Sequence, residues 1–485
     1  MLVWPAALQA QDPRVVGREW SRIWGTTNTE WGNSVCVDDA GYIYTVGKRL
    51  CPTSSLYSTY DITKFDQEGD RLWAQTYSAT ESLNFLCASV ADAGTSLVYV
   101  SGWESPGLVG PGSNNVGYLA ALDTEGVKQW EKRWGPWSVP TAIPQLGALC
   151  VATDRSAVVA YLCRLDAGGI TNPGAQDMFV AKVNTGGTTE WTRIWDSGYA
   201  DTPMDVCSDG ADHLYLAGVQ NDSIATFSTA VVMKLDLGGN IVWTHTWSTV
   251  DSWDGPAALG ICCDGTDSIY VVGGTQGSFD GQTNAGMYDS FMSKFNAAGD
   301  RLWSRIWGGP WEEKATGVGM SPFGEVVAVS DKMIGPGSWE LASYTPEGSH
   351  VWTRTWGPIT NAGWAWPGPR LDVFGTNVFV AHGVYSGEWD GQTNAGEQDF
   401  GLAKWNLDYQ PELQAPGAAG SNVMLGWHGA WNCTFDVEVS TNLCNTNAWA
   451  LLAGYTNLPG SEFMTATDSP PVRARFYRVK ATSND

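Results

Sequence analysis

Positive charge is scarce in this sequence: 27 lysine and arginine residues face 51 aspartate and glutamate residues, which leaves a formal net charge of −24 over 485 residues. An acidic surface repels the phosphates of nucleic acid and of anionic lipid, so we expect neither as a partner. Long apolar runs are also missing, because no stretch approaches the ~20 apolar residues of a membrane-spanning helix. We therefore expect no membrane insertion.

Catalytic motifs and helical periodicity are absent too. The sequence contains no G-x-S-x-G, no H-E-x-x-H and no glycine-rich phosphate loop. Its five histidines lie far apart, without the close spacing of a metal-ligand pair: His213, His245, His350, His382 and His428. No segment of the repeating region has the 3.6-residue spacing of an amphipathic helix. Catalysis is therefore poorly supported, and an all-β fold is expected.

Tryptophan and glycine are abundant, with 27 and 57 copies, and the tryptophans recur in one phrase about every 50 to 60 residues. The phrase occurs seven times: EWSRIWG from Glu19, LWAQTYS from Leu72, QWEKRWG from Gln129, EWTRIWD from Glu190, VWTHTWS from Val242, LWSRIWG from Leu302 and VWTRTWG from Val351. Three further strand-like segments lie between successive copies, and a Gly four residues before the Trp marks a tight hairpin. Each period therefore predicts one four-stranded sheet.

Repeated four-stranded sheets are typical of a β-propeller. The first Trp strand, residues 18–24, precedes every complete period, and the last period ends at 404–408 without one. We therefore expect a seven-bladed β-propeller closed by its N-terminal strand, which supplies the outer strand beside residues 400–405.

The stretch SFDGQTNAGMYDSFMSKFNAAGDRLWSRIWGG carries a resemblance to the SBBP-type bacterial β-propeller repeats. The resemblance covers residues 18–408 and weakens in the second and sixth blades, which lack the N-x-G-x-x-D element. It implies a secreted or cell-surface bacterial protein and no reaction of its own.

The predicted organisation has four parts. Residues 1–16 are expected to be a signal-peptide remnant and N-terminal arm, with cleavage after Ala10 but no basic n-region. The propeller covers 17–408, and the Pro/Gly/Ala-rich segment 409–421 is expected to be a linker. Residues 422–485, with the phrase FYRV, resemble a small fibronectin-type β-sandwich. In it Cys433 and Cys444 are a candidate disulfide.

Five other cysteines share one repeat position: Cys36, Cys87, Cys150, Cys207 and Cys262. A residue repeated at one place favours a small core side chain over a set of bridge partners. In the Trp strands, Trp303, Arg305 and Trp307 lie on one face, because strand positions two apart share a face. We expect this row to hold blades together through cation–π contacts.

A ligand site is expected on the loop face, where the loops from second to third strand and from outer to next inner strand emerge. Six tryptophans fall in these loops: Trp31, Trp137, Trp253, Trp311, Trp364 and Trp366. Exposed indoles stack on sugar rings, although each Trp is also explained as an anchor for its own loop.

Two copies of DGQTNAG in the same loops supply hard oxygen ligands that suit Ca²⁺. The candidate ligands are Asp280, Asn284, Asp289, Asp390, Asn394 and Asp399. A partial copy ends at Asp177. The spacing differs from that of an EF-hand, and turns that need Asp or Asn before Gly explain the same residues.

Two functional hypotheses follow. The first is a non-catalytic secreted or surface propeller without a cofactor, apart from the candidate Ca²⁺. It binds a glycan or a surface protein on its Trp-rich face, or assembles with itself into fibres or layers. The alternative is a propeller enzyme that uses a quinone cofactor or a metal in the central channel.

Overall fold

The structure, a computed structural model, is built from strands throughout the part of the chain that it describes. It describes residues 16–51, 54–77, 84–92, 97–105, 113–139, 148–163, 176–221, 228–249, 255–332, 337–359, 368–385, 388–389, 392–396, 398–408, 417–419, 422–428, 433–440, 450–452, 454–459, 463–468 and 476–483. Within these ranges no helix has the length and apolarity needed to span a bilayer. The prediction of an all-β chain is confirmed.

Seven sheets of four strands lie between Gly17 and Asn406, and the strand pairs of the six sheets from β2 to β25 are antiparallel. Sheet 1 is built from β2 (Glu30–Val37), β3 (Ile43–Cys51), β4 (Ser54–Phe65) and β5 (Arg71–Tyr77). Sheet 2 is built from β6 (Asn84–Asp92), β7 (Leu97–Ser105), β8 (Ser113–Asp123) and β9 (Lys128–Val139). Sheet 3 is built from β10 (Ala148–Val151), β11 (Ala157–Cys163), β12 (Asp177–Val183) and β13 (Thr189–Trp195). Sheets 4 and 5 are built from β14 (Ala200–Ser208), β15 (His213–Asn221), β16 (Ser228–Asp236) and β17 (Ile241–Trp247); and β18 (Ala257–Cys263), β19 (Ser268–Thr275), β20 (Asp289–Asn296) and β21 (Arg301–Trp307). Sheets 6 and 7 are built from β22 (Glu313–Met320), β23 (Val326–Lys332), β24 (Gly337–Tyr344) and β25 (His350–Ile359); and β26 (Arg370–Phe374), β27 (Asn377–Tyr385), β30 (Gln398–Asn406) and β1 (Gly17–Trp24).

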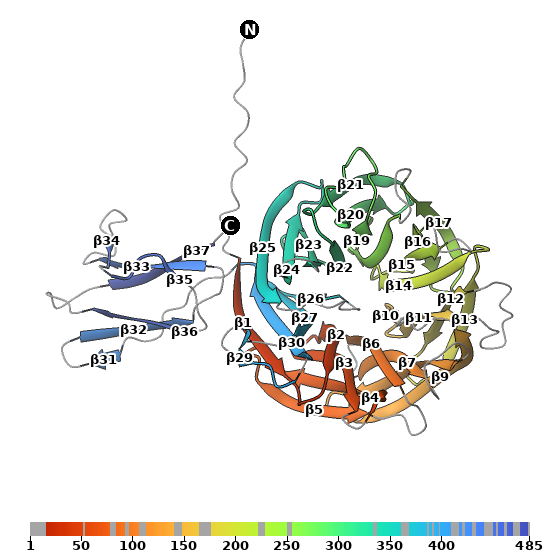
Figure 1. The fold of residues 1–485 in the computed structure, drawn as a ribbon, viewed down its shortest axis with the longest axis horizontal. Coiled ribbons are helices and arrows are strands. Elements are labelled where there is room, and N and C mark those ends of the chain that lie inside the picture. Colours follow the sequence, from red (N-terminus) through yellow and green to blue (C-terminus); the bar gives the residue numbers. More distant parts are fainter. Residues whose placement is uncertain are drawn as a thin grey trace, which may run out of the picture. The chain divides into compact units, whose positions relative to one another are not determined.

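The first strand of each sheet contacts the first strand of the next sheet, from β2 through β22 to β26, and β26 also contacts β2. Figure 1 shows these strands innermost, with the other three strands of each sheet outside them. Sheet 7 has the strand order β1-β30-β27-β26, so β1 lies beside β30. A short hairpin, β28 (Glu388–Trp389) and β29 (Gln392–Thr393), lies between β27 and β30 in the chain. The fold is propeller-like.

The hairpins from third to fourth strand have the predicted chemistry. In sheet 2, Gly126 has a φ of 83°. The carboxylate of Asp123 accepts hydrogen bonds from the main-chain nitrogens of Glu125 and Val127, at 3.1 and 2.7 Å. A side chain with Cβ strains such a left-handed backbone, which explains the glycine in this repeat position.

Apolar side chains fill the space between neighbouring sheets. The cluster between sheets 2 and 3 includes Tyr99, Leu119, Tyr161 and Phe179, all of them fully buried. Every residue of β11 and β12 is buried, which explains why these strands lack the polar alternation of a sheet with one wet face.

The repeated tryptophan joins sheets 1 to 5 each to the following sheet. Its indole nitrogen donates a hydrogen bond to a main-chain oxygen in the hairpin turn of the following sheet, at 2.8 to 3.1 Å: Trp73 to Thr124, Trp130 to Thr185, Trp191 to Leu237, Trp243 to Ala297 and Trp303 to Pro346. The ring packs on the turn glycine, since a Cβ on Gly348 would lie 2.9 Å from the Trp303 indole. This contact explains why the phrase repeats.

The arginine of the phrase contributes to the same junction. The Arg305 guanidinium lies 5.4 Å from the Trp303 ring centroid, so the predicted cation–π contact forms with the first tryptophan of the row, but within β21 and not between sheets. The Arg305 Nε also donates to the main-chain oxygen of Gly348, at 2.6 Å. Arg22 of β1 donates in the same way to Gly69 of sheet 1, at 3.0 Å.

The C-terminal strands form two further sheets, and the chain divides into two compact units. One unit spans 22–375 with 379–402, and the other contains the rest of the described chain. The C-terminal sheets have the orders β31-β32-β36 and β34-β33-β35, with β37 paired to β33. Their strands are β31 (Gly417–Ala419), β32 (Asn422–His428), β33 (Cys433–Ser440), β34 (Ala450–Leu451), β35 (Leu458–Pro459), β36 (Phe463–Asp468) and β37 (Phe476–Ser483). Leu425, Phe435 and Ala466 share their core. Cys444 lies outside the described residues.

Candidate functional site: the loop face and the central cavity

Acidic residues face each other at three junctions between sheets, where the loop before a third strand meets the loop before the next first strand. At each junction two residues form a parallel bridge: Gln176 with Ala200, Tyr288 with Glu312, and Gln398 with Thr29. The residue after each bridge partner is acidic, which gives three pairs: Asp177 and Asp201, Asp289 and Glu313, and Asp399 and Glu30. All six side chains are buried. The repeat therefore places two carboxyl groups at every one of these junctions.

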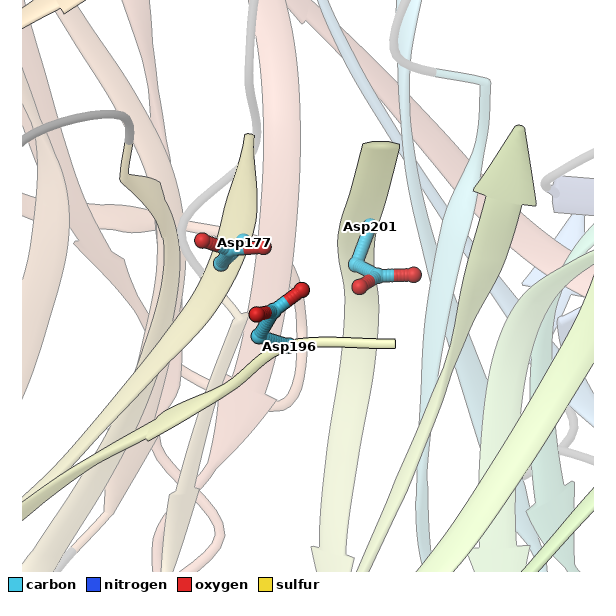
Figure 2. Close-up of side chains that lie close together, drawn as sticks. All are labelled: Asp177, Asp196 and Asp201. Carbon is cyan, nitrogen blue, oxygen red and sulfur yellow. The ribbon is translucent and has the colours of Figure 1, made fainter. Parts of the chain in front are cut away.

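The junction between sheets 3 and 4 has a third carboxyl group, that of Asp196. One oxygen each from Asp177, Asp196 and Asp201 lie within 4.8 Å of one another, and Figure 2 shows the three side chains together. Asp201 accepts hydrogen bonds from the Ser197 nitrogen and hydroxyl, at 2.9 and 2.7 Å. Burial, with a smaller contribution from Asp196, raises the pKa of Asp201 to about 6. Carboxylate oxygens at this density are chemically suited to a hard cation.

Sequence reasoning noted Asp177 but missed Asp196 and Asp201. A signal was present, because Asp196 occupies the position that is Gly in the phrases ending at Gly25 and Gly308. At Gly308 a Cβ would lie 2.4 Å from Asp289 Oδ1 and 3.1 Å from Glu313 Oε2. At Gly308 the absence of a side chain leaves room for the carboxyl groups of Asp289 and Glu313, whereas at the junction of sheets 3 and 4 Asp196 adds a third carboxyl group.

The predicted calcium ligands have identifiable partners within their loops. The Asn284 amide donates to the main-chain oxygen of Thr275 and accepts from the Gly286 nitrogen, at 2.8 and 3.1 Å. Asn394 makes the equivalent pair with Val384 and Gly396, at 2.8 Å each. These bonds stabilise the loop and leave calcium binding as a prediction.

The candidate aspartates divide between two places. Asp280 accepts from Arg301, at 2.7 Å, and from the Ser304 hydroxyl, at 2.6 Å, on the outer strand β21. Asp289 and Asp399 belong to the junction pairs and accept from the nitrogens of Ala285 and Ala395, at 2.5 and 2.6 Å. Asp390 lies outside the described residues.

Of the six candidate tryptophans, Trp311 is described as an exposed side chain. Its indole is 48% exposed, and the neighbouring Met287 is 53% exposed. The Met287 nitrogen donates to the Trp311 oxygen, at 3.2 Å, and Glu313 donates to Tyr288, at 2.9 Å. These two bonds join the backbone of the loop before β20 to that of the loop before β22, which carries Trp311.

The other candidate tryptophans differ in environment or are not described. Trp31 is half-buried, with the Lys48 ammonium 5.4 Å from its ring centroid. Trp137 is described only through its backbone, which pairs with Asn115. Trp253, Trp364 and Trp366 lie outside the described residues.

A central cavity of about 360 Å³ lies among the inner strands. Its polar lining includes Asp205, Arg370 and Asp372, together with the thiols of Cys36 and Cys150. Burial raises the pKa of Asp372 to about 6, even though its carboxylate accepts from the nitrogens of Val37 and Val373.

Arg370 joins four sheets at this cavity. Its Nη1 donates to the main-chain oxygens of Thr316 and Leu259, at 2.6 and 3.1 Å, and lies 3.5 Å from Asp205 Oδ2. Asp205 Oδ2 also accepts from the Ile261 nitrogen, at 3.0 Å. The charged groups of the cavity thus hold inner strands to one another.

The predicted shared position of the five cysteines is wrong for Cys87. Cys36, Cys207 and Cys262 each pair with a tyrosine of the second strand, whereas in sheet 2 Ala91 pairs with the equivalent Tyr99 and Cys87 pairs with Gly102. Cys36 is buried, as predicted for a core thiol, whereas Cys150, Cys207 and Cys262 are half-buried. The side chain of Cys87 is outside the described part of the structure.

No protein-family model matches the chain, and a search of curated proteins finds no match. Similar solved structures include a protein of unknown function from Dyadobacter fermentans DSM 18053, 8% identical, with a TM-score of 0.46 over 81% of this chain and 99% of that one. A europium-containing methanol dehydrogenase is 12% identical, with a TM-score of 0.40 over 81% and 93%. The polysaccharide lyase Uly1 is 8% identical, with a TM-score of 0.47 over 78% and 90%. Similarity at this level assigns no function to the site.

Proposed function

We propose that this protein is a non-catalytic, secreted or cell-surface bacterial propeller that binds a glycan on its loop face. In this proposal its seven sheets form one closed ring related to the SBBP-type repeats, and β1 closes that ring. Support for closure comes from the contact of β26 with β2, and from Arg22, which bonds to Gly69 as Arg305 bonds to Gly348.

The observation that carries the proposal is the indole of Trp311. The indole is 48% exposed beside Met287, which is 53% exposed, and an exposed aromatic face is a surface on which a sugar ring can stack. The main-chain oxygen of Trp311 accepts a hydrogen bond from Met287, so the backbone that carries the indole is tied to the neighbouring loop. The next residue, Glu312, is buried and pairs with Lys314, at 2.6 Å, an ion pair within the segment that carries the indole.

A glycan array followed by calorimetric titration of the best-bound sugar tests this proposal. We expect Trp311→Ala to weaken binding at least about tenfold, equivalent to about 1.4 kcal/mol. Leu302→Ala is the matched control, because Leu302 is 53% exposed on the outer strand β21. Binding that Trp311→Ala leaves unchanged, or a wild-type protein that binds no glycan, would contradict the proposal.

A surface protein or a second copy of this chain is the other ligand class within the same function. Sedimentation velocity over a range of protein concentrations shows whether the chain binds to itself. Concentration-dependent fibres or layers that Trp311→Ala abolishes would replace the glycan with self-assembly, whereas a monomer at every concentration would exclude that version.

The alternative is an enzyme with a quinone cofactor or a metal in the central cavity, and the cavity of about 360 Å³ is the observation that favours it. The described lining fits a planar cofactor poorly, since it offers Arg370 beside two carboxylates and no aromatic ring. Absorbance spectra and elemental analysis of the purified protein test this alternative, and the elemental analysis also tests the predicted Ca²⁺. A stoichiometric chromophore or redox metal would favour the enzyme.

A further inference from the structure

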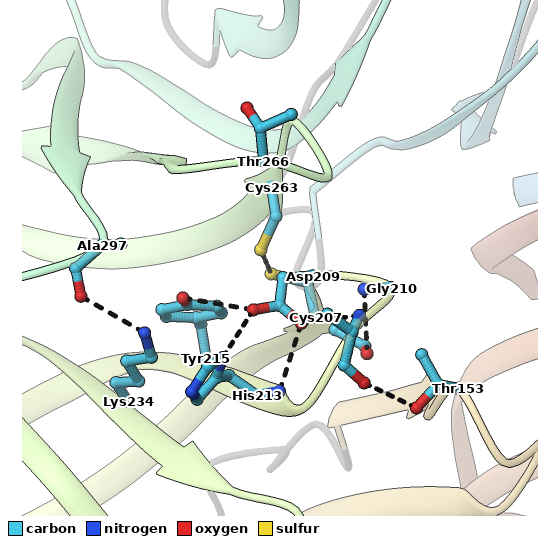
Figure 3. A network of polar contacts seen from close by, with 12 residues as sticks. Thr153, Cys207, Asp209, Gly210, His213, Tyr215, Lys234, Cys263, Thr266 and Ala297 are labelled. Carbon is cyan, nitrogen blue, oxygen red and sulfur yellow. Dashed lines mark hydrogen bonds and ion pairs between the residues drawn. The ribbon is translucent and has the colours of Figure 1, made fainter.

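Two thiols from neighbouring sheets meet beside the central cavity. The sulfur atoms of Cys207 on β14 and Cys263 on β18 lie 2.7 Å apart, although they are 56 residues apart in sequence. Figure 3 shows the pair pointing at each other, next to the turn that holds Asp209 and His213. This distance is shorter than ordinary sulfur packing and longer than an S–S bond of ~2.05 Å.

The pairing follows from which way each cysteine faces. Cys207 and Cys263 both pack against the apolar cluster between sheets 4 and 5. Cys262 precedes Cys263, so it points to the opposite face of β18 and packs against the cluster between sheets 5 and 6. A repeat-position cysteine thus faces the following sheet, and the residue after it faces the preceding sheet.

A thiol pair therefore needs a cysteine at the first position of one sheet and at the second position of the next. The phrase ICCDG of sheet 5 meets this requirement, because it doubles the cysteine. The second position is Val37 in sheet 1, Val151 in sheet 3, Ser208 in sheet 4 and Met320 in sheet 6. Of the aligned positions named here, Cys263 supplies the second-position cysteine, and it faces Cys207 of sheet 4.

We propose that Cys207 and Cys263 form a reversible disulfide that links sheet 4 to sheet 5. The oxidant is a small-molecule disulfide such as oxidised glutathione. One thiol loses its proton, and its sulfur attacks the oxidant, which forms a mixed disulfide and releases one glutathione. The second thiol loses its proton and displaces the second glutathione. The pair gives up two protons and two electrons, and the oxidant is reduced to two thiols.

The surroundings of the pair make this reaction slow at neutral pH. Burial, and then the contact with Cys263, raises the pKa of the Cys207 thiol, and the neighbouring Cys262 and Cys150 act in the same direction. Asp205 lies near this group of thiols and accepts from Ile261. Because the thiolate is the nucleophile, we expect the rate of crosslinking to rise as pH increases from 7 to 9.

Peptide mapping of the native protein tests the proposal. The protein is incubated with oxidised glutathione, quenched with acid, alkylated and digested with trypsin, which cuts after Arg193, Lys234 and Lys294. Cys207 and Cys263 then fall on separate peptides, 194–234 and 235–294. We expect one crosslink between these peptides, reversed by dithiothreitol, while Cys36 and Cys150 remain alkylated.

Single substitutions identify the partners. Cys207→Ser and Cys263→Ser should each abolish the crosslink, whereas Cys262→Ser should retain it, which distinguishes the two adjacent cysteines. Near-UV circular dichroism confirms that each variant is folded before oxidation. A crosslink that Cys263→Ser retains, a stable glutathione adduct at either residue, or alkylation of both thiols after oxidation at pH 9 would overturn the proposal.

Discussion

The indole nitrogen of Trp303 donates a hydrogen bond to the main-chain oxygen of Pro346, 3.0 Å away in the next sheet. Because the same bond recurs at four other junctions, it is the repeated unit of attachment between sheets. Trp303→Phe keeps an aromatic ring and removes the donor. We expect a loss of about 1 kcal/mol in the free energy of unfolding, measured by urea denaturation. Leu302→Ala, at an exposed neighbouring position, should change it by less than about 0.5 kcal/mol.

The turn glycine under this tryptophan supplies a second prediction. Gly348 and Gly324 both have a φ of 81°, but a Cβ would meet Trp303 at Gly348 and no atom within 4 Å at Gly324. Gly324→Ala therefore measures backbone strain alone, about 1 to 2 kcal/mol. Gly348→Ala should cost about 1 to 3 kcal/mol more, because the side chain also displaces the indole. Equal losses in the two variants would show that the ring does not pack on the turn.

A third prediction concerns pH and a buried carboxyl group in sheet 6. Burial raises the pKa of Asp331 to about 7, a rise that the nearby Lys314 opposes and Glu312 reinforces. The folded state therefore holds the proton more tightly than the unfolded state. Stability from this group is fully present below about pH 4 and is lost as pH rises towards 7.

The pH dependence of Asp331→Asn tests this reasoning. Between pH 4 and pH 7 the free energy of unfolding of the wild type should fall more steeply than that of the variant, by up to about 1.4 kcal/mol per pH unit. Asp39→Asn removes an exposed carboxylate and should follow the wild type. A wild type and an Asp331→Asn variant with parallel pH profiles would show that Asp331 is ionised in the folded protein.

The proposed disulfide predicts a change in stability. Its two cysteines are 56 residues apart, so the chain-entropy argument gives about 4 kcal/mol of stabilisation on oxidation. Oxidised wild type should therefore unfold at a higher denaturant concentration than reduced wild type. Cys207→Ser should unfold at the same denaturant concentration whether it is oxidised or reduced. If oxidised and reduced wild type also had equal unfolding midpoints, this result would argue against a disulfide between Cys207 and Cys263.

The strands and their hairpins were predictable from this sequence because local chemistry determines them. A turn such as Asp123 to Gly126 needs a side-chain acceptor for its own backbone and a glycine that tolerates positive φ. Both residue types can be read directly from the sequence. The row of Trp303 and Arg305 was also visible. Their bonds to Pro346 and Gly348 were not, since these depend on how one sheet packs on the next.

The site was less predictable for the same reason. The DGQTNAG loops indicated calcium, yet Asn284 bonds to Thr275 and Asp280 to Arg301 within the protein. The cluster of Asp177, Asp196 and Asp201 draws on residues at the start of β12, after β13 and at the start of β14. No local motif unites these three positions, and the meeting of Cys207 with Cys263 likewise requires the register between two sheets.

Amide hydrogen exchange of β1 tests whether the N-terminal strand closes the ring of sheets. β1 lies beside β30, and Glu19 pairs with Lys404, at 2.8 Å. We predict that the amides of β1 are protected from exchange to about the same degree as those of the outer strands β13 and β21. Exchange of β1 at the rate of an unstructured peptide, while β13 and β21 remain protected, would contradict the account.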